Sequence, residues 1–464
     1  MDLEVYLQKA LASIRRWESE WGDFERHSSL RTDEKSLRET FGRYLKLLEG
    51  NYPFFHPHYA GQMLKPPHPV AVAGYLAAML INPNNHALDG GPPTSEMEKD
   101  VVRRLGAMFG FPKDSLGHLT SGGTVANMEA LWVARESHPD KAVAFSEQAH
   151  YTHKRMGEVL RMKTVAIPAH PDGRIRLDVL EDALQSGKIG TVVMTAGSTG
   201  LGAVDPIEDI LDWRGKYGIR IHVDAAYGGF YSLLAADSES PISEETRRHF
   251  RAIAGCDSVV VDPHKHGLQP YGCGCVIFRD PSVGRFYKHE SSYTYFTSSE
   301  LHLGEISLEC SRAGAAAGAL WLTLEMFPLE ARGGLGPVLA SGARAARRWY
   351  DLQTESDVLR PYVRPELDIL TYFPIPDVKT AAAVDRLAQQ VFESTMSDSD
   401  DPVFLSVLRV DNTHLAALHP EIDSEAGSTR ILRSVLMKPE HLDAVDHLHA
   451  RVESAVRLAQ PAML

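Results

Sequence analysis

Cysteine, basic charge and long apolar runs are all scarce in this chain, and each shortage excludes a class of protein. The 464 residues include four cysteines, of which Cys273 and Cys275 are separated by a single residue. That spacing fits neither a disulfide framework nor a zinc site, so we expect reduced, buried thiols in a cytoplasmic protein without a metal. Lys and Arg total 48 against 61 Asp and Glu, a net charge of −13, which argues against a nucleic-acid partner. No run approaches the roughly 18 apolar residues of a membrane span, and we find no signal peptide, so we expect no membrane partner.

The remaining composition, 44% apolar and 23% charged, is typical of a globular protein with a substantial core. Its pattern predicts three parts: an N-terminal helical and loop segment over 1–93, a large α/β domain over 94–330 and a small α+β domain over 331–464.

The first part opens with apolar residues at helical spacing, among them Leu3, Leu7 and Ile14. They predict an amphipathic helix over 3–17, whose apolar face needs a surface to pack against. The proline- and aromatic-rich stretch at 51–69 then predicts an ordered loop, and a second helix follows at about 70–81.

The second part alternates short β-branched runs with helical patterns. Strands are predicted at 142–146, 191–195, 219–224, 258–262 and 275–279, and helices at 124–136, 206–217 and 243–254. This alternation predicts a mainly parallel sheet covered on both faces. The third part has predicted strands at 367–373, 403–410 and 429–437 and a closing helix that carries Leu442, Val445, Leu448 and Val452 on one face.

Three motifs follow predicted strands, where a parallel α/β sheet places its ligands. Thr120-Ser-Gly-Gly-Thr124 opens a helix, and a helix N-terminus with a hydroxyl favours a phosphate, although an ordinary N-cap looks the same. Asp224 ends a strand ahead of small residues. Its carboxylate can either reach a bound ligand or simply cap the turn that follows. Lys265 emerges from an apolar strand, and desolvation of such an amine suits Schiff-base chemistry, whereas a surface lysine in a turn is the simpler alternative.

Taken together, the three motifs fit pyridoxal 5'-phosphate. This cofactor needs an amine for an imine bond, a carboxylate at its ring nitrogen and an anion cradle for its phosphate. The carboxylate keeps the nitrogen protonated, so that the ring can take up electrons.

The motifs also resemble a known family, the group II pyridoxal-dependent amino-acid decarboxylases that act on aromatic amino acids, tyrosine, glutamate or histidine. The segments that carry the resemblance are Ser121-Gly-Gly-Thr-Val-Ala-Asn, Gln148-Ala-His150, Thr195-Ala-Gly-Ser-Thr199, His222-Val-Asp-Ala-Ala-Tyr227 and Asp262-Pro-His-Lys265. The resemblance implies an α/β fold of the aspartate-aminotransferase type and a homodimer with its active site at the interface. It also implies that carbon dioxide is released from a small amino-acid substrate.

Roles for individual residues are implied by the same resemblance. Lys265 matches the imine lysine, Asp224 the partner of the ring nitrogen, and His150 the histidine stacked on the ring. The other cofactor contacts that it implies are Gly123, Thr124, Thr199, Ala226 and His264. Tyr293 or Tyr295 matches the loop tyrosine that returns a proton to the product.

Several positions depart from the family pattern. Asp262 stands where many relatives have asparagine, and an anion there is unfavourable beside a phosphate unless it pairs with His264 or Lys265. Gln62, Asn84 and His86 bring amide and imidazole groups to a region where relatives have apolar side chains, and we expect them to bind substrate. Amides and an imidazole beside aromatic rings favour tyrosine, because a site built for a hydroxyl rejects analogues that lack it.

Other outcomes stay open on the sequence. A glutamate or aspartate decarboxylase, a decarboxylating aldehyde synthase, another pyridoxal-dependent carbon–carbon lyase and a catalytically idle partner share much of this pattern. Intact Lys265, Asp224 and His150 argue against the idle partner, and the loop tyrosines favour decarboxylation over aldehyde formation.

Overall fold

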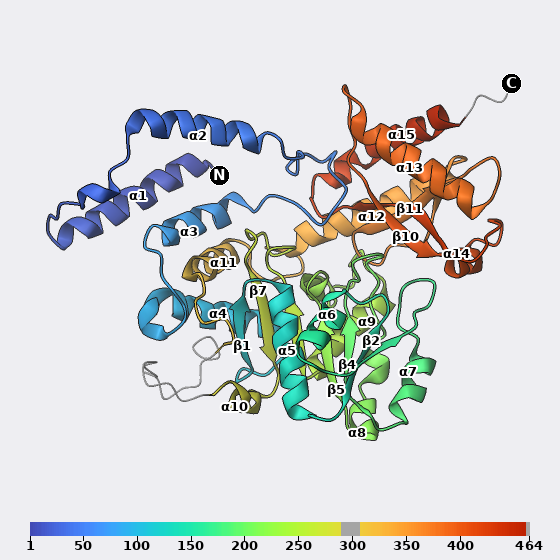
Figure 1. Ribbon diagram of the computed structural model, residues 1–464, viewed down its shortest axis with the longest axis horizontal. Helices are drawn as coiled ribbons and strands as arrows, with labels where there is room; N and C mark the ends of the chain where they lie inside the picture. The colour runs from blue at the N-terminus through green and yellow to red at the C-terminus, as the bar shows by residue number, and fades with distance from the viewer. Residues whose placement is uncertain (289–306, 461–464) are drawn as a thin grey trace.

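A computed structural model of the chain describes residues 1–288 and 307–460 (Figure 1). It contains two β-sheets, a larger one of seven strands and a smaller one of four. Each sheet supplies its own cluster of buried apolar residues, and helices cover both.

The seven-stranded sheet runs in the order β1-β7-β6-β5-β4-β2-β3. Its strands are β1 (Leu116–Thr120), β2 (Ala142–Ser146), β3 (Thr164–Ile167), β4 (Ile189–Thr195), β5 (Arg220–Asp224), β6 (Ser258–Val261) and β7 (Gly274–Phe278). Only β7 runs antiparallel to its neighbours, and the other pairings are parallel. Every residue of β4 and β6 is buried, as expected of strands covered on both faces. The mainly parallel sheet predicted from the sequence is therefore confirmed.

Helices pack around this sheet, and several of them begin directly after a strand. They are α4 (Pro92–Met108), α5 (Gly123–Ser137), α6 (Thr152–Val159), α7 (Leu177–Leu184), α8 (Trp213–Tyr217), α9 (Glu244–Ala252), α10 (Gly284–Tyr287) and α11 (Gly314–Met326). The single helix predicted at 206–217 is wrong, because the chain forms a 3-10 turn at Glu208–Ile210 and then the short α8. Gly215, which lies within α8, lowers helix stability here, whereas Pro206 would be tolerated in the first turn of a helix.

The four-stranded sheet is antiparallel, in the order β10-β11-β9-β8. Its strands are β8 (Leu359–Pro361), β9 (Ile369–Pro374), β10 (Ser406–Asp411) and β11 (Ser428–Val435), and its helices are α12 (Gly336–Glu355), α13 (Ala381–Ser397), α14 (Asn412–Leu418) and α15 (His441–Ala459). The closing helix packs on α12 and α13 through the predicted residues Val445, Leu448 and Val452, all fully buried.

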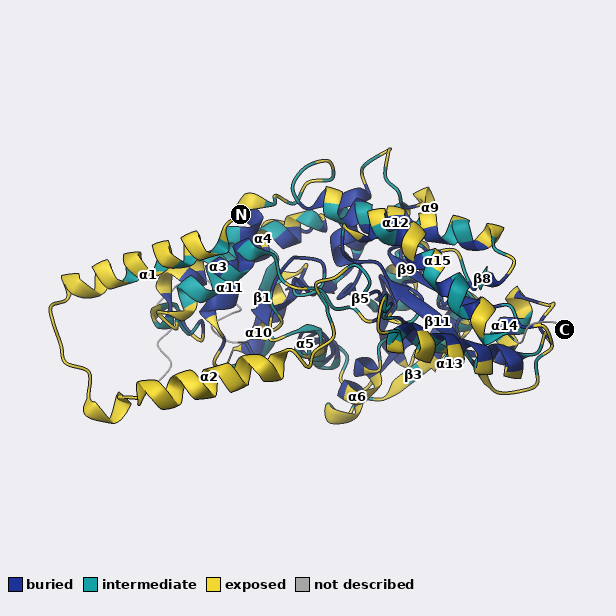
Figure 2. Cartoon of the chain, turned by 90° about the horizontal axis from the view of Figure 1, so that it is seen from above, coloured by how far each residue is buried: buried dark blue, intermediate teal, exposed yellow. Residues whose placement is uncertain are grey.

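The N-terminal helices stand away from this body (Figure 1). The helices that stand away are α1 (Leu3–Glu20) and α2 (Glu34–Leu48). The helix α3 (Pro69–Met79) follows them in the chain. One stripe of α1, including Leu3, Leu7 and Ile14, is half-buried where α1 packs on α3, so the expectation that its apolar face needs a surface is met in part. No residue of α1 or α2 is buried, and Figure 2 shows α2 exposed along its length and α1 exposed except for its half-buried stripe.

None of the described helices is both long and apolar enough to cross a membrane.

Candidate active site

A pocket of about 340 Å³ opens where β4, β5 and β6 end and α5 begins. All eight residues that the sequence marks as cofactor contacts line it: Gly123, Thr124, His150, Thr199, Asp224, Ala226, His264 and Lys265. They come from segments up to 142 positions apart, and the parallel strands bring them together because their carboxyl ends share one edge of the sheet.

The N-terminus of α5 forms one wall of the pocket. Gly122 has φ +151°, a left-handed conformation that favours glycine, and its carbonyl accepts the N–H groups of Val125 and Ala126. The N–H groups of Gly123 and Thr124 have no acceptor among the described residues. A side chain at position 123 has no room either, because its Cβ would lie 2.7 Å from Asp262 Oδ2. This wall is therefore an open anion cradle with free donors.

Asp224 lies at the end of β5 and is fixed by a histidine that our sequence analysis did not identify. His153, in the first turn of α6, places Nε2 2.8 Å from Asp224 Oδ2, and both side chains are buried. Because an ionised carboxylate only accepts, His153 Nε2 donates. Burial raises the pKa of Asp224, but the hydrogen bond and charge of His153, with the charge of Lys265, outweigh burial and hold it well below its usual range. The pocket thus keeps a buried, ionised carboxylate. In the sequence, the sign that could have pointed to His153 is its position three residues after His150, which is close to one turn of a helix.

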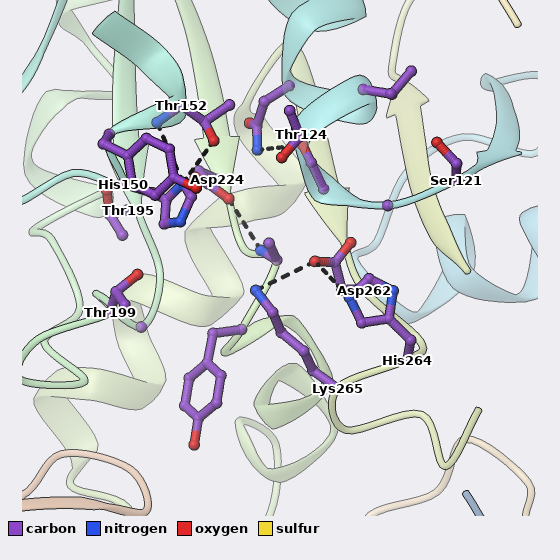
Figure 3. Close-up of a pocket in the computed structure, with 18 residues that line it drawn as sticks. Ser121, Thr124, His150, Thr152, Thr195, Thr199, Asp224, Asp262, His264 and Lys265 are labelled. Atoms are coloured by element: carbon purple, nitrogen blue, oxygen red, sulfur yellow. Dashed lines mark hydrogen bonds and ion pairs between the residues drawn. The ribbon is translucent and has the colours of Figure 1, made fainter. Parts of the chain in front are cut away.

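Lys265 and Asp262 point toward each other in the loop after β6 (Figure 3). The Lys265 amine lies 3.2 Å from Asp262 Oδ2, and His264 Nε2 lies 3.5 Å from the same oxygen. This is the pairing that makes an acidic residue tolerable at position 262. Asp262 Oδ1 and His264 Nδ1 are buried without a hydrogen-bond partner in the described structure. Both residues line the pocket, so some of its polar groups still lack a hydrogen-bond partner.

His150 and Thr199 lie on the other side of the pocket (Figure 3). His150 Nδ1 accepts from the backbone N–H of Thr152 and lies 2.7 Å from its hydroxyl oxygen, which leaves Nε2 as the proton-bearing atom. Burial lowers the pKa of His150, so its imidazole stays neutral at pH 7. The carbonyl of Thr199 accepts from Arg433 Nη2 at 2.7 Å, and Arg433, on β11, also holds the carbonyl of Gly200. Arg433 was not predicted; it ties the loop after β4 to the small sheet.

The three residues expected to bind substrate do not line this pocket. Gln62 is exposed, and its Oε1 accepts from Arg433 Nη1 at 3.3 Å. Asn84 donates to the Ser311 hydroxyl and accepts from the backbone N–H of Arg312, both more than 220 positions away in the sequence, and His86 is exposed in the same loop. Tyr293 and Tyr295, expected to donate a proton, lie outside the described residues.

Other polar groups of the sequence have structural positions. Arg312 forms a buried ion pair with Glu98 and donates to the carbonyls of Leu119 and Asn85, so it anchors this part of the chain. All four cysteines are free, and Cys310 is exposed, against the expectation of burial, whereas the other three are buried. Away from the pocket, the side chains of His58, Asp401 and His447 place three potential metal ligand atoms within 4.8 Å of one another.

Comparison with known proteins identifies the family. The family model described as the pyridoxal-dependent decarboxylase conserved domain matches residues 44–349 of this chain. The chain belongs to this family.

Two relatives and one solved structure show how close the similarity is. L-tyrosine decarboxylase of Enterococcus faecium is 27% identical over 460 residues, covering 76% of this chain and 75% of that protein. A probable L-tyrosine/L-aspartate decarboxylase of Methanothermobacter thermautotrophicus is 28% identical over 331 residues, covering 71% and 86%. The structure of Oryza sativa TDC with PLP and tryptamine matches with a TM-score of 0.78 at 18% identity, covering 99% of this chain and 98% of that one. The fold is thus that of the pyridoxal-dependent decarboxylases, and the chain is an amino-acid decarboxylase of this type.

The pocket fits the cofactor of the family by its own chemistry. An amine, a buried ionised carboxylate and a helix N-terminus with free donors occupy three walls of the same cavity. They match the aldehyde, the ring nitrogen and the phosphate of pyridoxal phosphate. The unpartnered Thr195 hydroxyl and His264 Nδ1 leave further polar atoms for it to contact.

Proposed function

We propose that this enzyme decarboxylates an aromatic L-amino acid, with tyrosine favoured, to give the amine and carbon dioxide. The observation that carries the proposal is the charge of the pocket. Among the described residues that line it, Lys265 is the only lysine or arginine, and its amine faces Asp262. An acidic substrate side chain needs a second cation, and the nearby Arg433 guanidinium is already committed to the carbonyls of Thr199 and Gly200.

Lys65 supports the same choice. It is the one lysine in the segment 51–93, where a basic substrate site was conceivable, and its amine donates to the carbonyl of Met437 at 3.4 Å. It is absent from the lining of the pocket. No residue of this segment lines the pocket of its own chain, so its neutral polar and aromatic groups would meet a substrate only across a dimer interface.

The residues of the pocket would act as follows. Lys265 would hold the cofactor covalently until the substrate amine takes its place. Asp224, held ionised by His153, would keep a proton on the ring nitrogen, and the N-terminus of α5 with Thr124 and His264 would hold the phosphate. Ala226 and His150 would contact the ring, with Thr199 near it. When bound, pyridoxal phosphate supplies an acceptor for the electron pair that carbon dioxide leaves behind. Tyr293 or Tyr295 then returns a proton to the substrate carbon.

We also propose a homodimer whose interface includes α1 and α2. These helices and the segment between them expose large apolar side chains without burying one residue, including Trp17 on α1, Trp21 and Phe24 after it, and Phe41 on α2. Exposed apolar surface of this extent marks an interaction site, and a second copy would cover it while bringing Asn84 and His86 toward the pocket of the partner. In this arrangement, residues 1–93 serve the interface, 94–330 bind the cofactor and 331–464 form the smaller domain.

A panel of amino acids tests the substrate. The purified holoenzyme is incubated with each of the twenty, and carbon dioxide, amine, aldehyde and ammonia are measured together. Tyramine and carbon dioxide in equal amounts from tyrosine support the proposal. Aldehyde with ammonia would identify an aldehyde synthase, and turnover confined to aspartate or glutamate would overturn the assignment of a neutral aromatic substrate.

A further inference from the structure

A second cavity, of about 730 Å³, lies apart from the cofactor pocket. It is bounded by the C-terminal half of α12, by β8 and the loop that follows, and by the start of α9. It shares no lining residue with the cofactor pocket, although both adjoin the loop after β4, through Leu201 on one side and Thr199 on the other. A ligand bound in this cavity would therefore occupy a site separate from that of the cofactor phosphate.

The carboxylates in its wall already have partners. Glu366 accepts from Arg174 Nε at 3.1 Å and from the Thr246 hydroxyl at 3.1 Å, and Glu245 pairs with Arg174 at 2.5 Å. Asp172 lies 3.9 Å from the same guanidinium. One arginine thus contacts all three acidic side chains, and the seven charged groups of the wall, four arginines and three acids, sum to +1.

Three other arginines line the cavity with no such partner. Arg347 on α12, Arg360 on β8 and Arg364 in the following loop have neither a hydrogen bond nor an ion pair within residues 1–288 and 307–460. Arg347 and Arg360 are half-buried, and Arg364 is exposed. Burial lowers the pKa of Arg347 and the charge of Arg364 lowers it further, while the charge of Asp351, one turn along α12, raises it. A half-buried cation beside a second cation is costly unless an anion neutralises it, and because the pKa stays lowered, Asp351 does so only in part.

We propose that this cavity binds a small, multiply charged anion through Arg347, Arg360 and Arg364. Guanidinium groups bind phosphate and carboxylate oxygens in bidentate pairs, and three of them on one cavity suit a ligand with two or more such groups. The volume lies in the range of small-molecule sites. The cavity wall has a formal charge of +1, whereas the chain as a whole carries −13, so the positive charge is local.

The test uses holoenzyme saturated with pyridoxal phosphate, so that the cofactor pocket is occupied. Pyrophosphate, inorganic phosphate and citrate are titrated separately by isothermal calorimetry at constant ionic strength, and thermal unfolding is followed in parallel. We expect saturable binding of pyrophosphate or citrate, tighter than that of phosphate, and a rise in Tm with ligand concentration. Preference for pyrophosphate would indicate a phosphorylated ligand, and preference for citrate a polycarboxylate.

Arg347→Gln and Arg364→Gln should each weaken this binding about ten-fold or more, since each removes a charge-assisted contact. Arg348→Gln is the matched control, because Arg348 is the next residue on α12 but is exposed and paired with Asp446 at 3.0 Å. It should bind like the wild type. Unchanged affinity in both cavity variants, equal loss in the control, or no saturable binding of any of the three anions would overturn the proposal.

Discussion

At the residue scale, the pocket shows how neighbouring charges decide what a side chain can do. The Asp224 carboxylate is ionised although it is buried, because His153 donates to it and Lys265 is close enough to influence it. The Asp262 carboxylate holds the Lys265 amine and neighbours His264 at the mouth of the cradle. Two acidic groups in one pocket thus have separate partners and separate tasks.

Lys265 should be the residue that binds the cofactor covalently. Reduction of the holoenzyme with borohydride should leave a stable adduct that peptide mass spectrometry finds on Lys265. Lys265→Ala should lose both the adduct and turnover, because no other lysine lines the described part of the pocket. Lys163→Ala, an exposed lysine, serves as the control and should retain both. An adduct on any other lysine would refute the assignment of the pocket.

His153 should be a positioning residue that acts through Asp224. His153→Leu removes the donor to a buried carboxylate, and such a bond contributes about 1.5–3 kcal/mol, so we expect kcat to fall roughly ten- to one-hundred-fold. The visible spectrum of the bound cofactor should change as well, because the ring nitrogen loses part of its protonation.

His153→Gln is the matched variant, since its amide can still donate to Asp224, and it should recover much of the wild-type spectrum and kcat. Thermal unfolding of both variants separates this role from a purely structural one. A Leu variant that is fully loaded, with the wild-type spectrum and kcat, would show that Asp224 needs no help from His153.

At the element scale, the sequence predicted those elements whose pattern is local. The strands β2, β5 and β6 follow short apolar runs, and the structure places them within one residue of the predicted ends. Thr124, Asp224 and Lys265 could be found because each follows a strand or opens a helix, whereas the other five proposed cofactor residues came from the resemblance to the family. β1, with Gly117 and His118 in its centre, lacks that apolar signal, and β3 carries it over only four residues before Pro168; neither strand was predicted.

Contacts between distant segments were beyond a local reading. Arg433 reaches Thr199 across 234 positions, and Arg312 reaches Glu98 across 214. The positions of Gln62 and Asn84 depend on such contacts too, which is why their spacing alone did not show whether they face the pocket of their own chain. His153 was local, but its chemistry depends on Asp224, 71 positions away.

The helix α2 should belong to the dimer interface. Phe41 is 54% exposed and lies beside Tyr44 on an apolar face that nothing covers within the described chain. Phe41→Asp should shift the protein from dimer toward monomer in analytical ultracentrifugation and lower activity with it. Arg43→Asp is the control, since two residues along a helix turn the side chain by about 200° to the opposite face. A monomeric, fully active wild type, or an intact dimer in the Phe41 variant, would contradict this assignment.

At the scale of the whole molecule, the segment 59–65 is fastened to the C-terminal part of the chain. The backbone N–H of Ala60 donates to Phe404, and the carbonyl of Ala60 accepts from the N–H of Val435. Lys438 donates to the carbonyl of Tyr59 at 2.6 Å, and Lys65 to that of Met437. The segment 59–65 is therefore joined to the C-terminal part of the chain in part through two lysines whose amines are largely shielded from solvent.

This junction predicts how stability depends on pH. Burial lowers the pKa of Lys65 to about 8 and that of Lys438 to about 8, against an ordinary value of 10.5. Between pH 8 and 10.5 the unfolded chain therefore binds more protons at these amines than the folded chain does, so their contribution to stability rises with pH through this window and is lost as pH falls through 8.

Lys65→Met should consequently stabilise the fold at pH 7, by about 2 kcal/mol, because it removes a charge that is poorly solvated while keeping the length of the side chain. The gain should shrink steadily between pH 8 and 10.5, where the folded wild type loses that charge and the unfolded chain keeps it. Lys163→Met, at an exposed position, should change stability little at any pH. The measurement is chemical denaturation of the three proteins at pH 7, 8, 9 and 10. A stabilisation by Lys65→Met that is independent of pH would come from better packing alone and would contradict the titration of Lys65, and a loss of stability at pH 7 would show that its bond to Met437 outweighs the burial of its charge.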